Sequence, residues 1–349
     1  MSDQITDRSN ADDQPEPEPE PTAVVAAEDT ARRADIVDAA PEPTYDAEAE
    51  RRRIRAERRA LLLKSPAFVV GAVILSFWIF CALFPGLLTT YGPSEVVRVP
   101  VLDETGEVVV DDDGDVVLEV IARAAPSGDA WFGTDTIGND VYTRVIHGAR
   151  PVLIVAPIAA LLAAIAGTML GLVMGYLKGW VDEVLSRILE AFLSIPVILL
   201  AIMTSVVFET TVPLLVITIA VLFTPIVART VRAAVIAEAQ LDYVTSARLR
   251  GESSLFIMTR EILPNITTVV VVEFTVRVGY AIFTVATLSF LGFSAFESTR
   301  ADWGSDVSKT YNLIQAGQWW PAIFPALAIA SLVIAVNLIA DSVDRVLKA

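Results

Sequence analysis

Six long apolar segments, separated by charged stretches, dominate this sequence of 349 residues. A helix needs about 20 mostly apolar residues to cross a bilayer. The predicted spans are Ala67–Leu88, Pro151–Tyr176, Ile188–Phe208, Val212–Ala228, Ile266–Leu291 and Ala322–Ala340. The sequence therefore predicts an all-α membrane protein with six transmembrane helices and with both termini on the same side.

Several kinds of chemistry are excluded by what the sequence lacks. One cysteine, Cys81, and one histidine, His147, are too few for a Cys/His metal site, a disulfide framework or a Ser-His-Asp triad. The sequence has no G-x-x-x-x-G-K-S/T phosphate loop, so any nucleotide hydrolysis would occur in another chain. No predicted span carries an aspartate within its core, which argues against an intramembrane aspartyl protease. We therefore expect no catalytic residue, no metal site and no bound cofactor.

The first 50 residues hold fifteen acids against three arginines, and so contain most of the excess negative charge. Their alternating prolines and glutamates offer too little apolar surface to offset the entropy lost on ordering a chain. Residues 1–50 are therefore predicted to be a disordered acidic tail that keeps this region solvated, with a docking role as the alternative. The tail has neither an apolar core nor a basic start, so it is not a cleavable signal peptide.

The distribution of basic residues predicts the orientation. Seven arginines and lysines crowd into the juxtamembrane segment 51–66, directly before the first transmembrane helix at 67–90. Short basic flanks stay in the cytoplasm and suit anionic lipid headgroups. We therefore expect both termini, residues 177–187 and residues 229–265 in the cytoplasm. Residues 91–150 carry twelve acids and four arginines, which agrees with an extracytoplasmic loop.

That outer loop is predicted to contain a small β-hairpin. Apolar residues alternate with the period of a strand on both sides of Asp113-Gly114, a favoured tight turn; they are Val108, Val110, Val116, Leu118 and Val120. The acidic turn has the wrong length for an EF-hand calcium loop, so a solvated turn is the preferred interpretation. After it, Asn139 or Asp140 can cap a short helix that runs through Arg150 to the second span.

Glycines recur every four residues in and just after the second span, at Gly167, Gly171, Gly175 and Gly179. They form one smooth stripe that lets another helix approach closely. Helix packing is the favoured interpretation, and a gating role is the alternative.

The segment between the fourth and fifth spans is predicted to protrude as two helices. The first runs from about Arg229 to Arg250 and stops at Gly251, which can take the left-handed C-terminal position. Ser253 or its neighbour then caps a second short helix, which Pro264 ends. Two spans could be joined by only a few residues. A capped protrusion therefore favours docking into a groove of a soluble partner over a plain solvated loop.

This segment resembles the "EAA" loop of ABC importer permeases. The pattern there is Glu-Ala, a glycine about a dozen residues later, and then Ile-x-x-x-x-Ile-Leu-Pro-Asn; Glu238-Ala239, Gly251, Ile257 and residues 262–265 fill it. In that family the loop is a coupling helix that sits in a cleft of the ATPase subunit. The resemblance implies an ATPase-docking surface in the coupling loop 229–265, formed by Glu238, Ala239, Asp242, Tyr243, Ala247, Arg248, Gly251, Arg260 and Pro264.

Further motifs, in order along residues 67–340, are similar to the dipeptide/oligopeptide/nickel branch and to its second, "C" type of permease. They include Gly133-Thr134-Asp135, residues 196–202, Asp242-Tyr243-Val244 and Trp303-Gly304. The chain departs from the branch at Val285, where an acid is usual, and in a reduced C-terminal pattern. The resemblance implies an ABC importer type I permease core over 151–345, forming half of a path for peptides. Nickel chelates, glutathione-like molecules or sugars are the alternative substrates.

The same resemblance implies the partners. They are a second homologous permease subunit, two ABC ATPase subunits that bind the ATP, and an extracytoplasmic substrate-binding protein, assembled in the cell membrane without nucleic acid. A membrane scaffold without a transport role is the rival hypothesis, and it predicts no ATPase partner.

Two charged residues, Glu273 and Arg277, lie inside the fifth span. Charges at that depth face the helix bundle or water. Their spacing of four residues favours a structural pair on one helix face, with a pore-lining site as the alternative.

Overall fold

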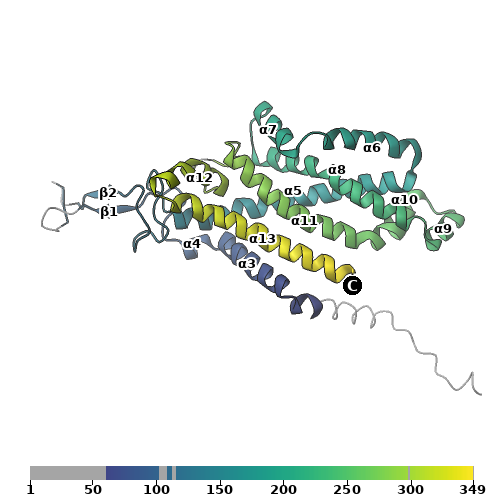
Figure 1. Ribbon diagram of the computed structural model, residues 1–349, viewed down its shortest axis with the longest axis horizontal. Helices are drawn as coiled ribbons and strands as arrows, with labels where there is room; N and C mark the ends of the chain where they lie inside the picture. The colour runs from purple at the N-terminus through teal and green to yellow at the C-terminus, as the bar shows by residue number, and fades with distance from the viewer. Residues whose placement is uncertain (1–59, 102–107, 112–114, 298, 349) are drawn as a thin grey trace, which may run out of the picture. The chain divides into compact units, whose positions relative to one another are not determined.

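The computed structural model describes residues 60–101, 108–111, 115–297 and 299–348 (Figure 1). The predicted acidic tail 1–50 and most of the basic segment 51–66 lie outside these residues. Within the described part, five helices are long and apolar enough to cross a membrane, or six if one bent pair of helices counts as a single span. The expected all-α membrane architecture with a small β-structure is confirmed.

The elements follow one another in this order: α3 (Pro66–Leu83), α4 (Pro85–Leu88), β1 (Arg98–Pro100), β2 (Leu118–Val120), α5 (Val141–Leu177), α6 (Gly179–Leu193), α7 (Val197–Val207), α8 (Val212–Glu238), α9 (Asp242–Leu249), α10 (Ser254–Phe256), the π-helical turn η1 (Ile257–Ile262), α11 (Leu263–Phe290), α12 (Trp303–Thr310), the 3-10 helix η2 (Tyr311–Ala316) and α13 (Trp320–Lys348).

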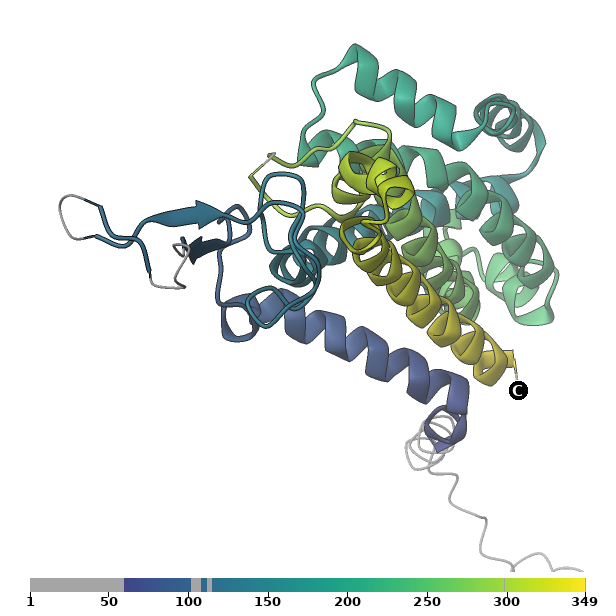
Figure 2. The same cartoon turned by 60° about the vertical axis from the view of Figure 1, so that its left-hand side comes forward.

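The first span is shorter than predicted. Ser65 caps α3 by accepting a hydrogen bond from the backbone N–H of Phe68 at 3.4 Å. The helix ends at Leu83 because Pro85 has no N–H and its ring clashes with the preceding turn. Figure 2 shows α3 alongside α13, where the Trp78 indole donates to the Ser331 hydroxyl at 2.9 Å.

The second span and the short helix expected before it are one continuous helix, α5. Asp140 caps it by accepting from the backbone N–H of Thr143 at 2.9 Å, and the helix passes through Pro151 and Pro157 without ending. Its 37 residues extend over about 55 Å at 1.5 Å per residue. Since a bilayer core is about 30 Å thick, α5 is long enough to extend beyond it.

The third span is broken, which the prediction of one helix over Ile188–Phe208 missed. The chain forms α6 and α7, two helices that meet at an angle of 81°. The break falls at Pro196, which stands just before α7 with an extended ψ of 129°. Because proline disfavours the helical conformation in the residue before it, the helix cannot continue through this point. Residues 179–187, expected as part of a connecting loop, belong to α6.

The glycine stripe brings α5 against α8. A Cβ added at Gly171 would lie 2.7 Å from the Cβ of Val231, and the same close approach recurs at Gly167 and Gly175, each against a valine of α8. The packing interpretation is therefore confirmed for these three glycines. Gly179 is different: its φ is +60°, no heavy atom lies near its Cβ position, and it begins α6 instead of packing.

The β-structure contains the predicted hairpin pairing and a second pairing that was not predicted. β1 and β2 are antiparallel, with Arg98 opposite Val120 and Pro100 opposite Leu118. The predicted strands pair with each other at the bridge between Val110 and Val116, where the Val117 N–H donates to the Val109 carbonyl at 2.9 Å. The expected turn at Asp113-Gly114 lies outside the described residues. The second pairing was missed because the pattern of alternation indicates strands without indicating all of their partners.

The long helices separate two ends of the bundle. α9 and α10 precede α11, and α12 follows it, so that these elements lie at opposite ends of a helix of 28 residues (Figure 1). The small sheet lies beyond the end that carries α12 (Figures 1 and 2). Two regions follow from this arrangement, the α8–α11 segment (residues 239–262) at one end and the surroundings of α12 at the other.

Candidate functional site

The α8–α11 segment turns sharply where a continuous helix had been expected. α8 ends at Glu238, and α9 starts only at Asp242. The Tyr243 hydroxyl donates to the Glu238 carboxylate at 2.6 Å and accepts from the Asn265 amide at 3.0 Å. Burial, followed by the hydrogen bond to Glu238, raises the pKa of Tyr243 to about 12. The protonated hydroxyl therefore links the end of α8 to the start of α11.

A tight stop separates α9 from α10, as predicted. Gly251 has a φ of +80°, its N–H donates to the Arg248 carbonyl, and the N–H of Glu252 reaches back to the Ala247 carbonyl. These two bonds form the Schellman arrangement that ends a helix. The Ser253 hydroxyl then caps α10 by accepting from the backbone N–H of Phe256 at 3.2 Å.

Pro264 does not end the second helix. It stands at the start of α11, directly after the π-helical turn η1. The helix that starts at Ser254 therefore continues to Phe290. In this way the α8–α11 segment is joined directly to the fifth span.

Two residues predicted to lie on the docking surface are instead in the interior. Ala239 is 4% exposed and Ala247 is fully buried. They form part of a small apolar core with Val244, Ile257 and other residues of the segment, packed against the end of α8. Their small side chains let α9 lie close to the helices beneath it. These two residues of the predicted docking surface therefore form a packing face instead.

The outward face of the segment is apolar at several positions that were not predicted as site residues. Leu249 is 85% exposed, Leu255 67% and Leu241 47%, and Phe256 is also exposed. Several large apolar side chains exposed within one short segment are typical of an interaction surface. The sequence offered one indication of this surface. Leu249 and Leu255 lie beside the helix ends at Gly251 and Ser253, where a connecting loop needs no leucine.

The charged residues predicted for this surface lie outward but differ in their contacts. Asp242, Arg248 and Arg260 are exposed. The Arg248 guanidinium stands 4.9 Å from the centre of the Tyr176 ring, at the end of α5. Glu238 is half-buried and is occupied by its hydrogen bond with Tyr243. The structure thus separates residues that shape the segment from residues that face outward.

Glu273 and Arg277 pair within α11. The Arg277 guanidinium donates twice to one carboxylate oxygen of Glu273, at 2.9 and 3.1 Å, and also lies 5.3 Å from the centre of the Tyr280 ring. Both side chains are largely buried, with 11% and 15% exposed. The favoured prediction of a pair on one helix face agrees with this geometry.

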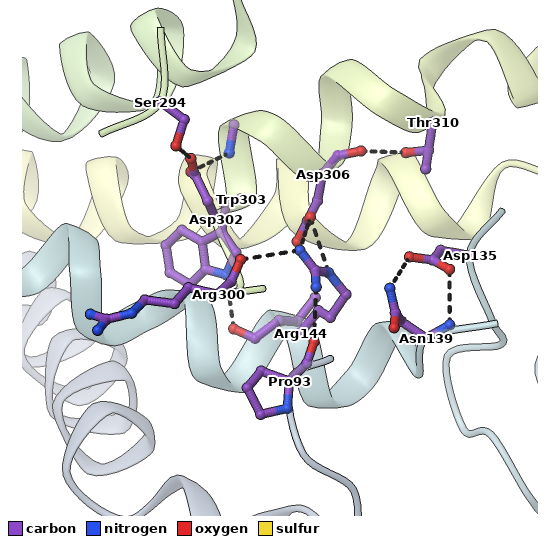
Figure 3. A network of polar contacts seen from close by, with 12 residues as sticks. Pro93, Asp135, Asn139, Arg144, Ser294, Arg300, Asp302, Trp303, Asp306 and Thr310 are labelled. Atoms are coloured by element: carbon purple, nitrogen blue, oxygen red, sulfur yellow. Dashed lines mark hydrogen bonds and ion pairs between the residues drawn. The ribbon is translucent and has the colours of Figure 1, made fainter. Parts of the chain in front are cut away.

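At the opposite end, Arg144 of α5 connects three separate segments (Figure 3). Its guanidinium donates to the Asp306 carboxylate of α12 at 2.5 and 3.0 Å, and to the Pro93 carbonyl at 2.8 Å. A longer contact of 3.4 Å reaches the Arg300 carbonyl. Both charged side chains are less than 10% exposed. Arg144 was not among the site residues that the sequence predicted.

Burial raises the pKa of Asp306 to about 6, against the opposing effect of Arg144. The neighbouring Trp303 is fully buried and donates its indole N–H to the Val145 carbonyl at 2.8 Å. α12 is therefore fastened to α5 by an ion pair and by an aromatic anchor. Two cavities, of about 620 and 460 Å³, lie beside these contacts.

Comparison with known proteins identifies the class of protein to which this architecture belongs. Residues 167–349 match the model of the family described as "Binding-protein-dependent transport system inner membrane component", and the chain belongs to this family. The match includes the broken span, the α8–α11 segment and α11 to α13. The chain is therefore a permease subunit of an ABC importer, a multi-pass inner-membrane protein and not an enzyme.

Individual relatives place the chain in the peptide branch. The dipeptide transport system permease protein DppC of Escherichia coli is 36% identical over 274 residues, which cover 78% of this chain and 85% of that protein. DppC of Alkalihalophilus pseudofirmus is 32% identical, covering 80% and 84%. The di/tripeptide transport system permease protein DppC of Pseudomonas aeruginosa is 31% identical, covering 78% and 84%. The predicted family and branch are confirmed.

Proposed function

We propose that this chain forms half of the translocation path of an ATP-driven peptide importer and docks an ATPase subunit through its α8–α11 segment. The docking proposal is carried by one observation: the segment has an apolar core of its own and still exposes several leucines. The names of the relatives support peptides as the substrate. The complete complex would contain a second permease, two ATPases and an extracytoplasmic binding protein.

The proposed orientation places both termini and the α8–α11 segment in the cytoplasm, and α12 with the small sheet outside. It rests on the basic residues that precede the first span and on the acidic character of residues 91–150. Single cysteines introduced at the exposed positions Glu119 and Ser254 test it in intact cells, in a Cys81→Ser background. Labelling by an impermeant maleimide is expected at position 119 only, and labelling at 254 instead would reverse the orientation.

The docking surface can be tested without disturbing the fold of the segment. Leu249→Asp and Leu255→Asp place charges at exposed positions, so both variants should insert and fold normally while less ATPase subunit co-purifies. Leu63→Asp is a matched control, because it makes the same change at another leucine that is 67% exposed, outside the segment. Wild-type co-purification and peptide uptake in both segment variants would contradict the docking role of these leucines.

The shape of the segment provides an independent test. Gly251→Val introduces a Cβ that meets no atom within 4 Å, so its effect is conformational, at roughly 1–2 kcal/mol for the left-handed backbone. Glu238→Lys removes the acceptor of Tyr243 and should loosen the bend. We expect both variants to uncouple ATP hydrolysis from peptide uptake in proteoliposomes. Tight coupling in both would show that the geometry of the segment is not needed.

A further inference from the structure

The smaller of the two cavities described above, about 460 Å³, is formed by four parts of the chain. One wall comes from α5, from His147 to Val155, and another from the first residue of α8, Val212. The third comes from Phe296, Arg300 and Ala301, between α11 and α12, and the fourth is Pro93. A volume of this size falls within the usual range for small-ligand sites.

The charged residues that line this cavity all have the same sign. Its charged lining residues are Arg150 and Arg300, and His147 stands beside them; no aspartate or glutamate is among the described residues that line it. Arg150 is exposed and has no carboxylate within 4 Å in the described part of the chain. Arg300 has one acid nearby, Glu297, at 4.0 Å, and both side chains are exposed.

This charge is opposite to that of the surrounding sequence. Residues 91–150 carry twelve acids against four arginines, so the outer segment as a whole repels anions. A cavity lined by two arginines within such a region concentrates negative groups locally. Arginine also presents a planar fork of donors that matches a carboxylate in two hydrogen bonds.

The remaining wall of the cavity is apolar. Ile154, Val155, Val212 and Phe296 line it beside the arginines. An anion such as phosphate would gain nothing from these side chains, whereas a molecule with a carboxylate and an adjacent apolar side chain would bury both parts. The lining thus fits a short amphiphilic carboxylate.

The buried Arg144 contacts hold this site in shape. Pro93 and Arg300 both line the cavity, and the carbonyls of both accept hydrogen bonds from the Arg144 guanidinium (Figure 3). The backbone of Arg300 is therefore held to α5 through its carbonyl oxygen. A preformed site loses less entropy on binding than one that must be ordered.

We propose that this cavity binds the C-terminal carboxylate of a short peptide, with the arginines Arg150 and Arg300 at the carboxylate and the apolar wall at the last side chain. The assignment rests on the proposed function for peptides as substrate and for the outward position of α12. It makes this end of the permease a recognition site that discriminates between peptides by their terminal charge.

Binding can be measured without the substrate-binding protein, whose own selectivity would mask the effect. The probes are dialanine and its C-terminal amide, observed by saturation-transfer NMR with the assembled importer in lipid nanodiscs. Dialanine is expected to bind better than the amide. Arg150→Gln and Arg300→Gln should each weaken dialanine by about two- to fivefold, the range of exposed ion pairs, and leave the amide unchanged. Arg98→Gln is the matched control, an exposed arginine of β1 outside the cavity.

Equal binding of dialanine and its amide to the wild type would overturn the proposal. So would unchanged dialanine binding in the double variant of Arg150 and Arg300, or an equal loss in the Arg98 control. ATP-dependent uptake of dialanine, measured with the binding protein in proteoliposomes, tests the proposed function separately. Uptake without a preference for the carboxylate overturns the cavity site alone. A preference for the carboxylate without uptake overturns peptide import and leaves a carboxylate site.

Discussion

Replacing Gly171 by alanine should push α5 and α8 apart. The added Cβ would lie 2.7 and 2.8 Å from the Cβ and a methyl carbon of Val231, and 2.9 Å from the Ala228 carbonyl oxygen. Carbon atoms in contact prefer about 3.5–4.0 Å, so the helices must separate by roughly 1 Å. Val231 is fully buried and the carbonyl belongs to the backbone; neither can move aside by a change of rotamer.

The energetic consequence can be worked out from two opposing effects. Overpacking of this kind costs about 1–3 kcal/mol, while alanine is favoured over glycine in a helix by about 1 kcal/mol. A net destabilisation of roughly 0–2 kcal/mol remains. Gly86→Ala in α4 is the control, since its Cβ would meet no heavy atom within 4 Å, and it should be neutral or slightly stabilising.

The assay is thermal unfolding of the purified protein in detergent, followed by intrinsic fluorescence. Gly171→Ala should lower Tm by a few degrees relative to the control. The double variant Gly171→Ala/Val231→Gly moves the Cβ from one helix to the other, so it should be more stable than the sum of the single variants, with a coupling of about 0.5–3 kcal/mol. Equal Tm values for Gly171→Ala and Gly86→Ala, or strict additivity in the cycle, would refute the reasoning.

Three further predictions concern charged groups. Burial raises the pKa of Asp306 to about 6, so the folded state keeps a proton that the unfolded chain loses near pH 4. Stability should therefore fall as pH rises from about 4 to 6, by about 3 kcal/mol, and Asp306→Asn should flatten this slope in melts recorded against pH. Asp182 and Arg232 join α6 to α8 through hydrogen bonds of 2.5 and 2.6 Å. A double-mutant cycle with Asp182→Asn and Arg232→Gln should show a coupling of about 1 kcal/mol in Tm measurements. Strictly additive effects of the two substitutions would disprove the coupling. Removing both charges, in Glu273→Gln/Arg277→Leu, should preserve more stability than Arg277→Leu alone, because the single change leaves a buried charge without its partner; equal melting temperatures would argue against a structural pair.

Much of the fold could be predicted because lipid constrains a sequence strongly. Runs of about 20 apolar residues place the spans, and the spacing of four residues in the glycine stripe indicates the face of α5 that packs. Gly251 and Ser253 mark a helix end and a helix start through their local chemistry. Each of these signals depends on residues that are close together in the sequence, so it can be recognised without the tertiary structure.

The errors occurred where contacts between distant segments decide the structure. The break between α8 and α9 involves Tyr243 and Asn265, which are separated by 22 residues. Ala239 and Ala247 proved to be interior because the apolar residues of η1 and α11 pack against them. The strand pairing of β1 and β2, like the direction in which exposed Leu249 points, depends on which surfaces meet after the chain has folded.

The sequence by itself therefore determined the class of protein, the number and approximate position of its apolar segments, and the motif that carries the family resemblance. Only the tertiary structure decided which residues of that motif face outward, how the third span bends, and that Arg144 meets Asp306 across 162 positions of the chain. The physical reason is that hydropathy and helix capping are properties of neighbouring residues. Burial, ion pairing and the shape of a cavity arise only when remote segments come together.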